Sequence, residues 1–205
     1  MKKGIAFFMM IIGIAALILR LKLRIETEDV SVVESITRFL SYFTIITNLL
    51  VTVYFSVIFF SIKKQTIFHK TGSLTAIAAF MAFVGLAYHI LLRHVWDPKG
   101  LTMVLDEIHH TIVPIATILF WWFYEKRNLV KFKILSFWIL YPILYLIWIS
   151  VRGYLSSFYP YYFLDANSLG TQKAILNSLG LLVIIILFLT IFYVIGKKFK
   201  TVATS

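Results

Sequence analysis

Three side chains in this sequence have the types and spacing that nucleophilic catalysis requires. A threonine hydroxyl is a weak nucleophile that needs a neighbouring base, and histidine is the usual base near neutral pH. Thr44 supplies the hydroxyl and His110 the base. Asp106 lies four residues before His110 and shares its helix face, so its carboxylate is expected to accept one ring N–H and leave the other nitrogen as the base. The set predicts attack by Thr44 on an ester or related acyl group.

Further polar residues are predicted to lie at the same depth as this set. We expect His89 and Asn48 to form a polar wall or to donate hydrogen bonds to an oxyanion. The supporting set as a whole is Asp106, His89, Asn48, Thr47, His109 and Arg152. Pro114 has no N–H for the carbonyl of His110, so the helix should be loosened at that histidine.

Two alternatives to threonine chemistry stay open. In the first, His89, His109 or His110 joins Asp106 in binding Zn²⁺, which would activate water. Adjacent histidines point about 100° apart on a helix, so their spacing is not diagnostic. In the second there is no chemistry, and the cavity binds or passes a lipid or small molecule. The primary interpretation needs no metal and no cofactor, and the absence of cysteine rules out thiolate ligands and a cysteine nucleophile.

The elements that must position these residues are apolar and long. The 205 residues are 60% hydrophobic with a mean hydropathy of +0.90, which a soluble domain of this size could not bury. Segments of about 20 apolar residues must cross a bilayer as helices. We predict an all-α polytopic integral membrane protein, one six-helix domain over residues 1–205, with spans at about 5–21, 39–62, 74–93, 108–124, 134–151 and 175–196. Arg20, Lys22 and Arg24 are expected to snorkel at the end of the first span.

Charged residues assign a side to each loop. The N-terminus, residues 63–70, residues 125–133 and the C-terminal tail hold twelve of the twenty Lys and Arg residues but only one of the nine acids. The other loops hold eight of each. Basic excess on alternate loops marks the cytoplasmic side, so both termini are predicted to be cytoplasmic. The net charge of +11 is therefore explained by the membrane topology and by attraction to anionic lipid. We expect no nucleic-acid partner and no particular protein partner.

With this topology, the polar residues gather near the outer boundary. Arg38, Ser41 and Thr44 are predicted to share one face of the second span. Polar faces at one depth indicate a cavity open to the outer side. The aromatic-rich loop 152–165 is expected to form an interfacial belt or a lid over that cavity.

The chain resembles the androgen-induced-protein family of six-helix membrane proteins, in particular its bacterial branch. The resemblance rests on three pieces in order along the chain: residues 41–50 (Ser-Tyr-Phe-Thr-Ile-Ile-Thr-Asn-Leu-Leu), Asp106-x-x-x-His110-x-x-x-Pro114, and Arg152-Gly153 followed by residues 159–165 (Tyr-Pro-Tyr-Tyr-Phe-Leu-Asp).

Eukaryotic members hydrolyse fatty acid esters of hydroxy fatty acids with a threonine nucleophile and a histidine. The resemblance therefore implies a membrane lipid-ester hydrolase acting on a fatty-acyl ester, with Thr44 and His110 in those roles, in a bacterial plasma membrane. This chain has Thr47 where several eukaryotic members have Asp. Its histidine-to-proline spacing is one residue shorter for His110, which leaves His109 as the alternative base.

Overall fold

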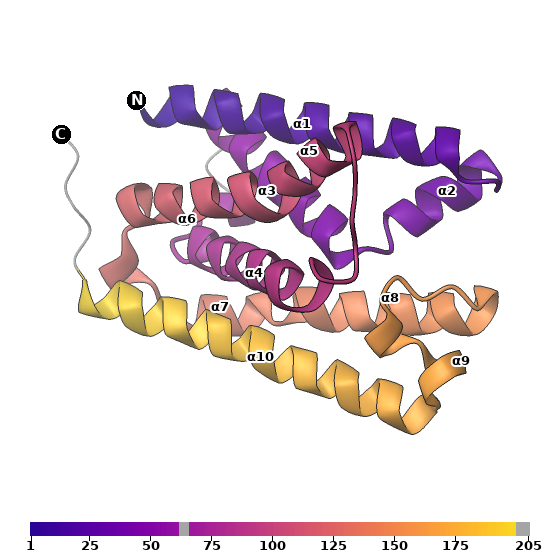
Figure 1. The fold of residues 1–205 in the computed structure, drawn as a ribbon. Helices are drawn as coiled ribbons and strands as arrows, with labels where there is room; N and C mark the ends of the chain where they lie inside the picture. The colour runs from indigo at the N-terminus through magenta and orange to yellow at the C-terminus, as the bar shows by residue number, and fades with distance from the viewer. Residues whose placement is uncertain (62–65, 200–205) are drawn as a thin grey trace.

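The computed structural model describes residues 1–61 and 66–199 and confirms an all-α architecture within them (Figure 1). Within these residues, six helices are long and apolar enough to cross a membrane, as predicted. The six candidate spans are Lys2–Thr27, Phe43–Phe60, Ser73–Leu92, Leu101–Tyr124, Phe132–Ser156 and Thr171–Lys198.

These spans are built from α-helices and two π-helical turns. The elements of the spans are α1 (Lys2–Thr27), α3 (Phe43–Phe60), α4 (Ser73–Ala87) with η2 (Tyr88–Leu92), α5 (Leu101–Glu107) with η3 (Ile108–Ile112) and α6 (Val113–Tyr124), α7 (Phe132–Trp138) with α8 (Leu140–Ser156), and α10 (Thr171–Lys198). Shorter helices join them: α2 (Val32–Phe39), η1 (Ile67–His69), η4 (Arg127–Leu129), η5 (Tyr162–Leu164) and α9 (Ala166–Leu169).

The first helix is longer than predicted, because its charged end stays helical. Pairs of opposite charge one turn apart support the last turns: Lys22 with Glu26 at 3.7 Å and Arg24 with Glu28 at 2.6 Å. The helix ends at Thr27, not near residue 21. Arg20 therefore lies within α1 and does not mark its end.

The second span begins later than predicted, because the chain breaks at residues 40–42. Before the break, Ser31 caps α2 by accepting a hydrogen bond from the backbone N–H of Glu34 at 3.2 Å. After it, α3 begins at Phe43. Arg38 thus belongs to a separate helix, and the prediction that it shares a helical face with Thr44 was wrong.

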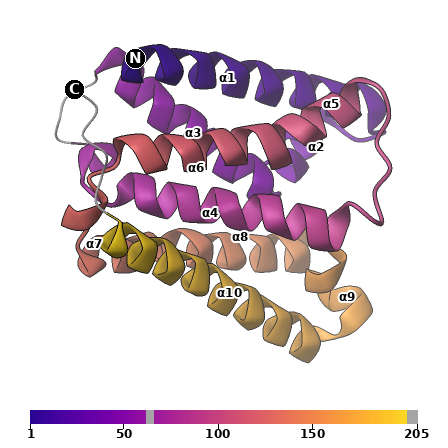
Figure 2. The same ribbon diagram turned by 60° about the vertical axis from the view of Figure 1, so that its left-hand side comes forward.

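Helix α4 lies at the centre of the bundle. Figures 1 and 2 show it between a layer with α1, α3 and α6 and a layer with α8 and α10. A run of six residues at its middle is fully buried: Ala76, Ile77, Ala78, Ala79, Phe80 and Met81. Small residues let neighbouring helices approach closely, so the three alanines explain why this helix can be surrounded on all sides.

Two π-helical turns lie side by side near one end of the bundle. In η3 the N–H of Val113 bonds the carbonyl of Ile108, five residues back. At this wider spacing, residue 114 would bond the carbonyl of His109 rather than that of His110. Pro114 has no N–H to make this bond, and the amide of Asn48 donates to the His109 carbonyl at 3.2 Å instead. The helix is loosened as predicted, but the carbonyl that takes a side-chain donor is one residue earlier.

The second π turn, η2, continues α4 past Gly85. A Cβ built on Gly85 would lie 3.0 Å from the carbonyl oxygen of His110. A side chain at this position would require the backbone of η3 to give way by a few tenths of an ångström. The close approach sets the two π turns against each other, and both carry residues of the candidate site.

Candidate functional site

A cavity of about 470 Å³ opens at the end of the bundle that carries α2 and the 93–100 loop, opposite the N-terminus. We call it the polar cavity. Its polar and aromatic lining is Arg20, Arg24, Thr27, Glu28, Phe39, Tyr42, Thr44, Tyr88, Trp96, Thr102, Asp106, His109, His110 and Tyr161. Thr44 and His110 thus share one cavity although 66 positions of sequence separate them.

The imidazole of His110 is held by two contacts. Its Nδ1 lies 2.9 Å from the backbone carbonyl of Asp106, and its ring stacks on Tyr88 with centroids 3.9 Å apart. A carbonyl only accepts hydrogen bonds, so Nδ1 carries the proton and Nε2 carries a lone pair. Among the described residues nothing hydrogen-bonds to Nε2. The histidine is therefore fixed in the tautomer that a general base requires.

The role predicted for the Asp106 carboxylate was wrong. One carboxylate oxygen pairs with Arg20 at 3.1 Å, and the other accepts a hydrogen bond from the indole of Trp96 at 2.6 Å. Asp106 orients His110 through its main chain instead, because both lie on one helix four residues apart. That helix begins at Leu101, which puts Asp106 in its second turn rather than at its start. The side chain serves to tie α1 and the 93–100 loop to α5.

Thr44 lies in the first turn of α3 and is half-buried at the cavity wall. Among the described residues no hydrogen bond joins it to His110, so the two face one cavity without forming a bonded pair. The neighbour of its hydroxyl is the phenol of Tyr161. Burial raises the pKa of that phenol to about 12, and the Thr44 hydroxyl is the largest influence in the opposite direction.

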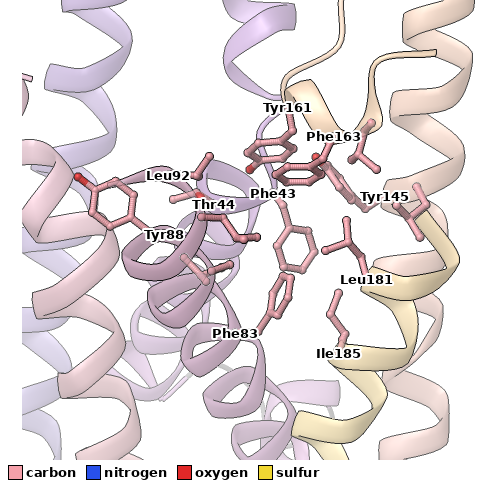
Figure 3. A pocket seen from close by; sticks show the side chains of 15 residues that line it. Phe43, Thr44, Phe83, Tyr88, Leu92, Tyr145, Tyr161, Phe163, Leu181 and Ile185 are labelled. Atoms are coloured by element: carbon pink, nitrogen blue, oxygen red, sulfur yellow. The ribbon is translucent and has the colours of Figure 1, made fainter. Parts of the chain in front are cut away.

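A narrow apolar pocket of about 40 Å³ adjoins the polar cavity (Figure 3). Phe43, Phe83 and Leu181 line it from α3, α4 and α10, and further lining residues come from η2, α8 and the loop that follows α8. Four residues line both spaces: Thr44, Tyr88, Leu92 and Tyr161. The hydroxyl of Thr44 therefore lies where a polar and an apolar compartment meet.

Asn48 and Thr47 do not line either space. The Asn48 amide donates to the carbonyl of Thr44 at 2.9 Å and to that of His109 at 3.2 Å, which uses both of its hydrogens. The prediction of Asn48 as an oxyanion donor is therefore wrong, and the residue instead links α3 to η3. The Thr47 hydroxyl lies 2.9 Å from that of Tyr141 and donates to the carbonyl of Phe43 at 2.6 Å.

His109 lines the polar cavity but is only 1% exposed. Its ring faces the backbone of Ala16 on α1, and neither ring nitrogen has a hydrogen bond of normal geometry among the described residues. Unlike His110, it has no contact that fixes its tautomer. The geometry thus distinguishes the two adjacent histidines, which the sequence left open.

His89 faces away from the polar cavity, so its predicted place in the cavity wall was wrong. It closes a ring of four side chains. Arg93 donates to Nδ1 at 3.1 Å, Nε2 donates to Thr111 at 3.0 Å, Thr111 donates to Glu107 at 2.7 Å, and Glu107 pairs with Arg93 at 2.9 Å. The ring joins η2 to η3. Within residues 1–61 and 66–199 no three His, Asp or Glu residues form a group that could hold a metal ion, so this geometry gives the zinc alternative no support.

Arg152 also lies outside the cavity. It pairs with Glu34 of α2, which Arg38 bonds at 2.8 Å, and both guanidinium groups lie over the ring of Phe158. Hydrogen bonds from Arg38 first, and then from Arg152, lower the pKa of Glu34. The next residue, Gly153, leaves room for Tyr159, whose ring would clash with any Cβ there. These contacts hold α2 and the aromatic loop against α8.

Sequence reasoning missed several residues of the site. Tyr88 and Trp96 were not predicted, Tyr161 was expected only as part of the aromatic-rich loop 152–165, and Arg20 only as the end of a span. Two signals were available beforehand: Tyr88 directly precedes His89, and Tyr161 lies in the loop that was expected to form a belt or a lid over the cavity. No family model, curated protein or solved structure matches the chain.

Proposed function

We propose that this protein is a membrane-embedded hydrolase of lipid esters, with Thr44 as the nucleophile and His110 as the base. The observation that carries the proposal is the position of Thr44. It lines both the polar cavity that holds His110 and the apolar pocket between α3, α4 and α10. An ester bond of a lipid likewise lies between a polar part and an acyl chain, so a carbonyl at Thr44 would place the first carbons of the chain at the apolar pocket, which at about 40 Å³ admits only that part of it.

The mechanism follows from the protonation state of His110. Its Nε2 takes the proton as Thr44 Oγ attacks the acyl carbonyl carbon, and a tetrahedral oxyanion forms. Collapse of this intermediate breaks the bond to the alcohol, which receives the proton from Nε2. Water then attacks the acyl-threonine by the same steps in reverse and releases the fatty acid. The missing Thr44–His110 hydrogen bond is common in unliganded sites, where catalytic contacts tighten on substrate binding.

The resemblance to the androgen-induced-protein family supports the same assignment, residue by residue, at Thr44 and His110. We also propose that the polar cavity faces the outer side of a bacterial plasma membrane. The basic residues support this orientation, because Lys2 at the start of α1 lies over Tyr124 at the end of α6, and Lys197 at the end of α10 donates to the carbonyl of Asn128, at the end of the bundle opposite α2.

The test uses the full-length protein, purified in detergent, with 4-nitrophenyl decanoate as the substrate. Thr44→Val should abolish hydrolysis, whereas Thr44→Ser should keep it, because only the hydroxyl is required. Thr117→Val is the matched control, since that hydroxyl donates to the Val113 carbonyl at 2.8 Å and does not line the cavity. An alkyl fluorophosphonate should label the wild type on Thr44, as mapped by mass spectrometry.

Near-normal turnover in the Thr44→Val protein would refute the threonine mechanism. If the wild-type protein cleaves no long-chain ester at all, the polar cavity and the apolar pocket would instead favour the second candidate, a non-catalytic lipid or small-molecule binder or transporter. The specific observation behind that candidate is the unbonded Thr44–His110 pair in a cavity of about 470 Å³. Retention of the fatty acid by the purified protein without turnover would support it.

A further inference from the structure

The proposed mechanism leaves the negative charge of the tetrahedral intermediate without a partner. Acyl-transfer enzymes place hydrogen-bond donors at that oxygen, and each donor contributes much of the rate. Asn48, the donor suggested by the sequence, has both amide hydrogens bonded to backbone carbonyls. Thr47 is likewise engaged, by Phe43 and Tyr141. A side-chain donor must therefore come from the residues that surround Thr44 at the junction of the two spaces.

Two phenols lie at that junction, and they point differently. Tyr88 and Tyr161 each line both the polar cavity and the apolar pocket. Figure 3 shows the hydroxyl of Tyr88 on the side of its ring away from Thr44, whereas the ring of Tyr161 lies above Thr44. Tyr161 lines the same junction as Thr44, and its phenol lies within reach of the Thr44 hydroxyl and of the backbone of Phe43 and Thr44.

We infer that Tyr161 is a further catalytic residue, whose phenol O–H donates a hydrogen bond to the oxyanion formed on Thr44. The inference rests on the proposed hydrolase function. As the bond from Thr44 Oγ to the acyl carbon forms, the carbonyl electron pair moves onto oxygen, and Tyr161 donates to that oxygen without transferring its proton. When the carbonyl re-forms and the alcohol leaves, the hydrogen bond weakens again.

The surroundings of Tyr161 suit this role because they fix the ring. It stacks on Phe163 with centroids 5.2 Å apart and planes 5° apart, and it meets Tyr42 edge-on at 5.7 Å. The backbone of Phe163 is anchored in turn, because Asn177 of α10 donates to its carbonyl at 2.8 Å. A donor held in place before reaction costs no reorganisation when the charge develops. With a pKa raised to about 12, the phenol also keeps its proton at any physiological pH.

The experiment compares two neighbouring tyrosines. Tyr161→Phe removes only the hydroxyl and keeps both ring contacts, and Tyr162→Phe is the matched control because Tyr162 is 59% exposed. With purified full-length protein and 4-nitrophenyl decanoate, Tyr161→Phe should lower kcat about 100- to 1,000-fold with little change in KM, as measured for loss of one oxyanion donor. It should slow fluorophosphonate labelling of Thr44 by a similar factor. Tyr162→Phe should match the wild type, and both variants should unfold at the wild-type temperature.

The outcomes separate this inference from the function on which it rests. If Thr44→Val is inactive but Tyr161→Phe retains kcat within about twofold of the wild type, Tyr161 is not the donor and the threonine mechanism stands. A Tyr161→Phe protein that raises KM alone would also overturn the inference, since an oxyanion donor acts on the transition state. If Thr44→Val is fully active, or the wild type cleaves no ester, the hydrolase proposal is wrong, and the inference about Tyr161 is wrong as well because it depends on that proposal.

Discussion

The ring of Tyr88 lies flat on the ring of His110, with planes 11° apart and centroids 3.9 Å apart. The two residues come from different π turns, η2 and η3, which the absence of a side chain at Gly85 brings together. The stack and the carbonyl of Asp106 leave the imidazole one orientation. The two π turns thus hold the side chains of Tyr88 and His110 in place rather than making them mobile. π turns occur frequently at functional sites.

Tyr88→Leu should therefore impair catalysis more than Tyr88→Phe. Phenylalanine keeps the stack, and the phenol of Tyr88 points away from Thr44, so kcat should stay within about twofold of the wild type. Leucine removes an aromatic contact that contributes about 0.5–1.5 kcal/mol, which frees the ring and should lower kcat about tenfold. Ester hydrolysis by the three proteins gives the comparison, and equal loss in both variants would show that the hydroxyl rather than the stack matters.

The ion pair between Arg20 and Asp106 predicts a stability effect that is not additive. The carboxylate is 3% exposed, so Arg20→Met would leave a buried charge with only Trp96 as its donor and should lower the free energy of unfolding by about 3 kcal/mol. Removing both charges in Arg20→Met/Asp106→Leu should recover most of that loss. Unfolding of the purified proteins by heat or denaturant measures both effects.

The same double variant tests how His110 is oriented. Its contact with residue 106 is through the main-chain carbonyl, which a leucine also provides. Ester hydrolysis should therefore survive in the folded Arg20→Met/Asp106→Leu protein. If the double variant folds normally but is completely inactive, the carboxylate of Asp106 rather than its main-chain carbonyl orients His110.

Sequence alone was enough to predict the class of the fold and the end of the bundle where polar residues gather. Hydropathy is a local property of the chain, so six spans could be counted, and Thr44 and His110 could be placed at one depth before their helices were known to meet. The partners of the polar residues could not be found this way. The carboxylate of Asp106 could pair with His110 on its own helix or with Arg20 on another helix. Only the packing of α1 against α5 determines which partner it has.

The π turns mark a second limit of sequence reasoning. Pro114 correctly indicated a loosened helix, but the α-helical spacing assumed for it assigned the missing bond to His110. The wider turn moves that bond to His109, where Asn48 meets it. An error of one residue in backbone register thus changed Asn48 from a predicted oxyanion donor into a link between two helices.

The proposed orientation predicts which loops an external reagent reaches. The chain has no cysteine, so single cysteines can be introduced without background labelling. A membrane-impermeant maleimide on intact cells should label Asn167→Cys, which is exposed near the polar cavity end, but not Lys126→Cys, which is exposed at the other end. Labelling of Lys126→Cys before cell lysis would place the polar cavity on the cytoplasmic side.

Acid should weaken the contact between α2 and α8. The pKa of Glu34 is lowered from 4.5 by Arg38 and Arg152, so the folded state binds this proton less readily than the unfolded chain does. The stability that Glu34 contributes is therefore fully present above pH 4.5 and is lost as the pH falls through its lower folded pKa. The thermal midpoint of the wild type should decline faster below pH 4.5 than that of Glu34→Gln, and parallel curves for the two proteins would contradict the assignment.

Replacing each of the adjacent histidines by methionine should have opposite consequences. His109 is buried with no hydrogen bond of normal geometry to either ring nitrogen, so an apolar side chain of similar length removes an unsatisfied polar group, which costs about 1–3 kcal/mol. His109→Met should raise the thermal midpoint and keep ester hydrolysis. His110→Met should leave folding nearly unchanged, since methionine can still pack on Tyr88, but should abolish hydrolysis because no base remains. Adding Thr44→Val to His110→Met should make activity scarcely worse, because residues that act as one unit are not additive. If His109→Met is the inactive variant instead, the base is His109, and the ring would have to leave its position against α1 before it could reach Thr44.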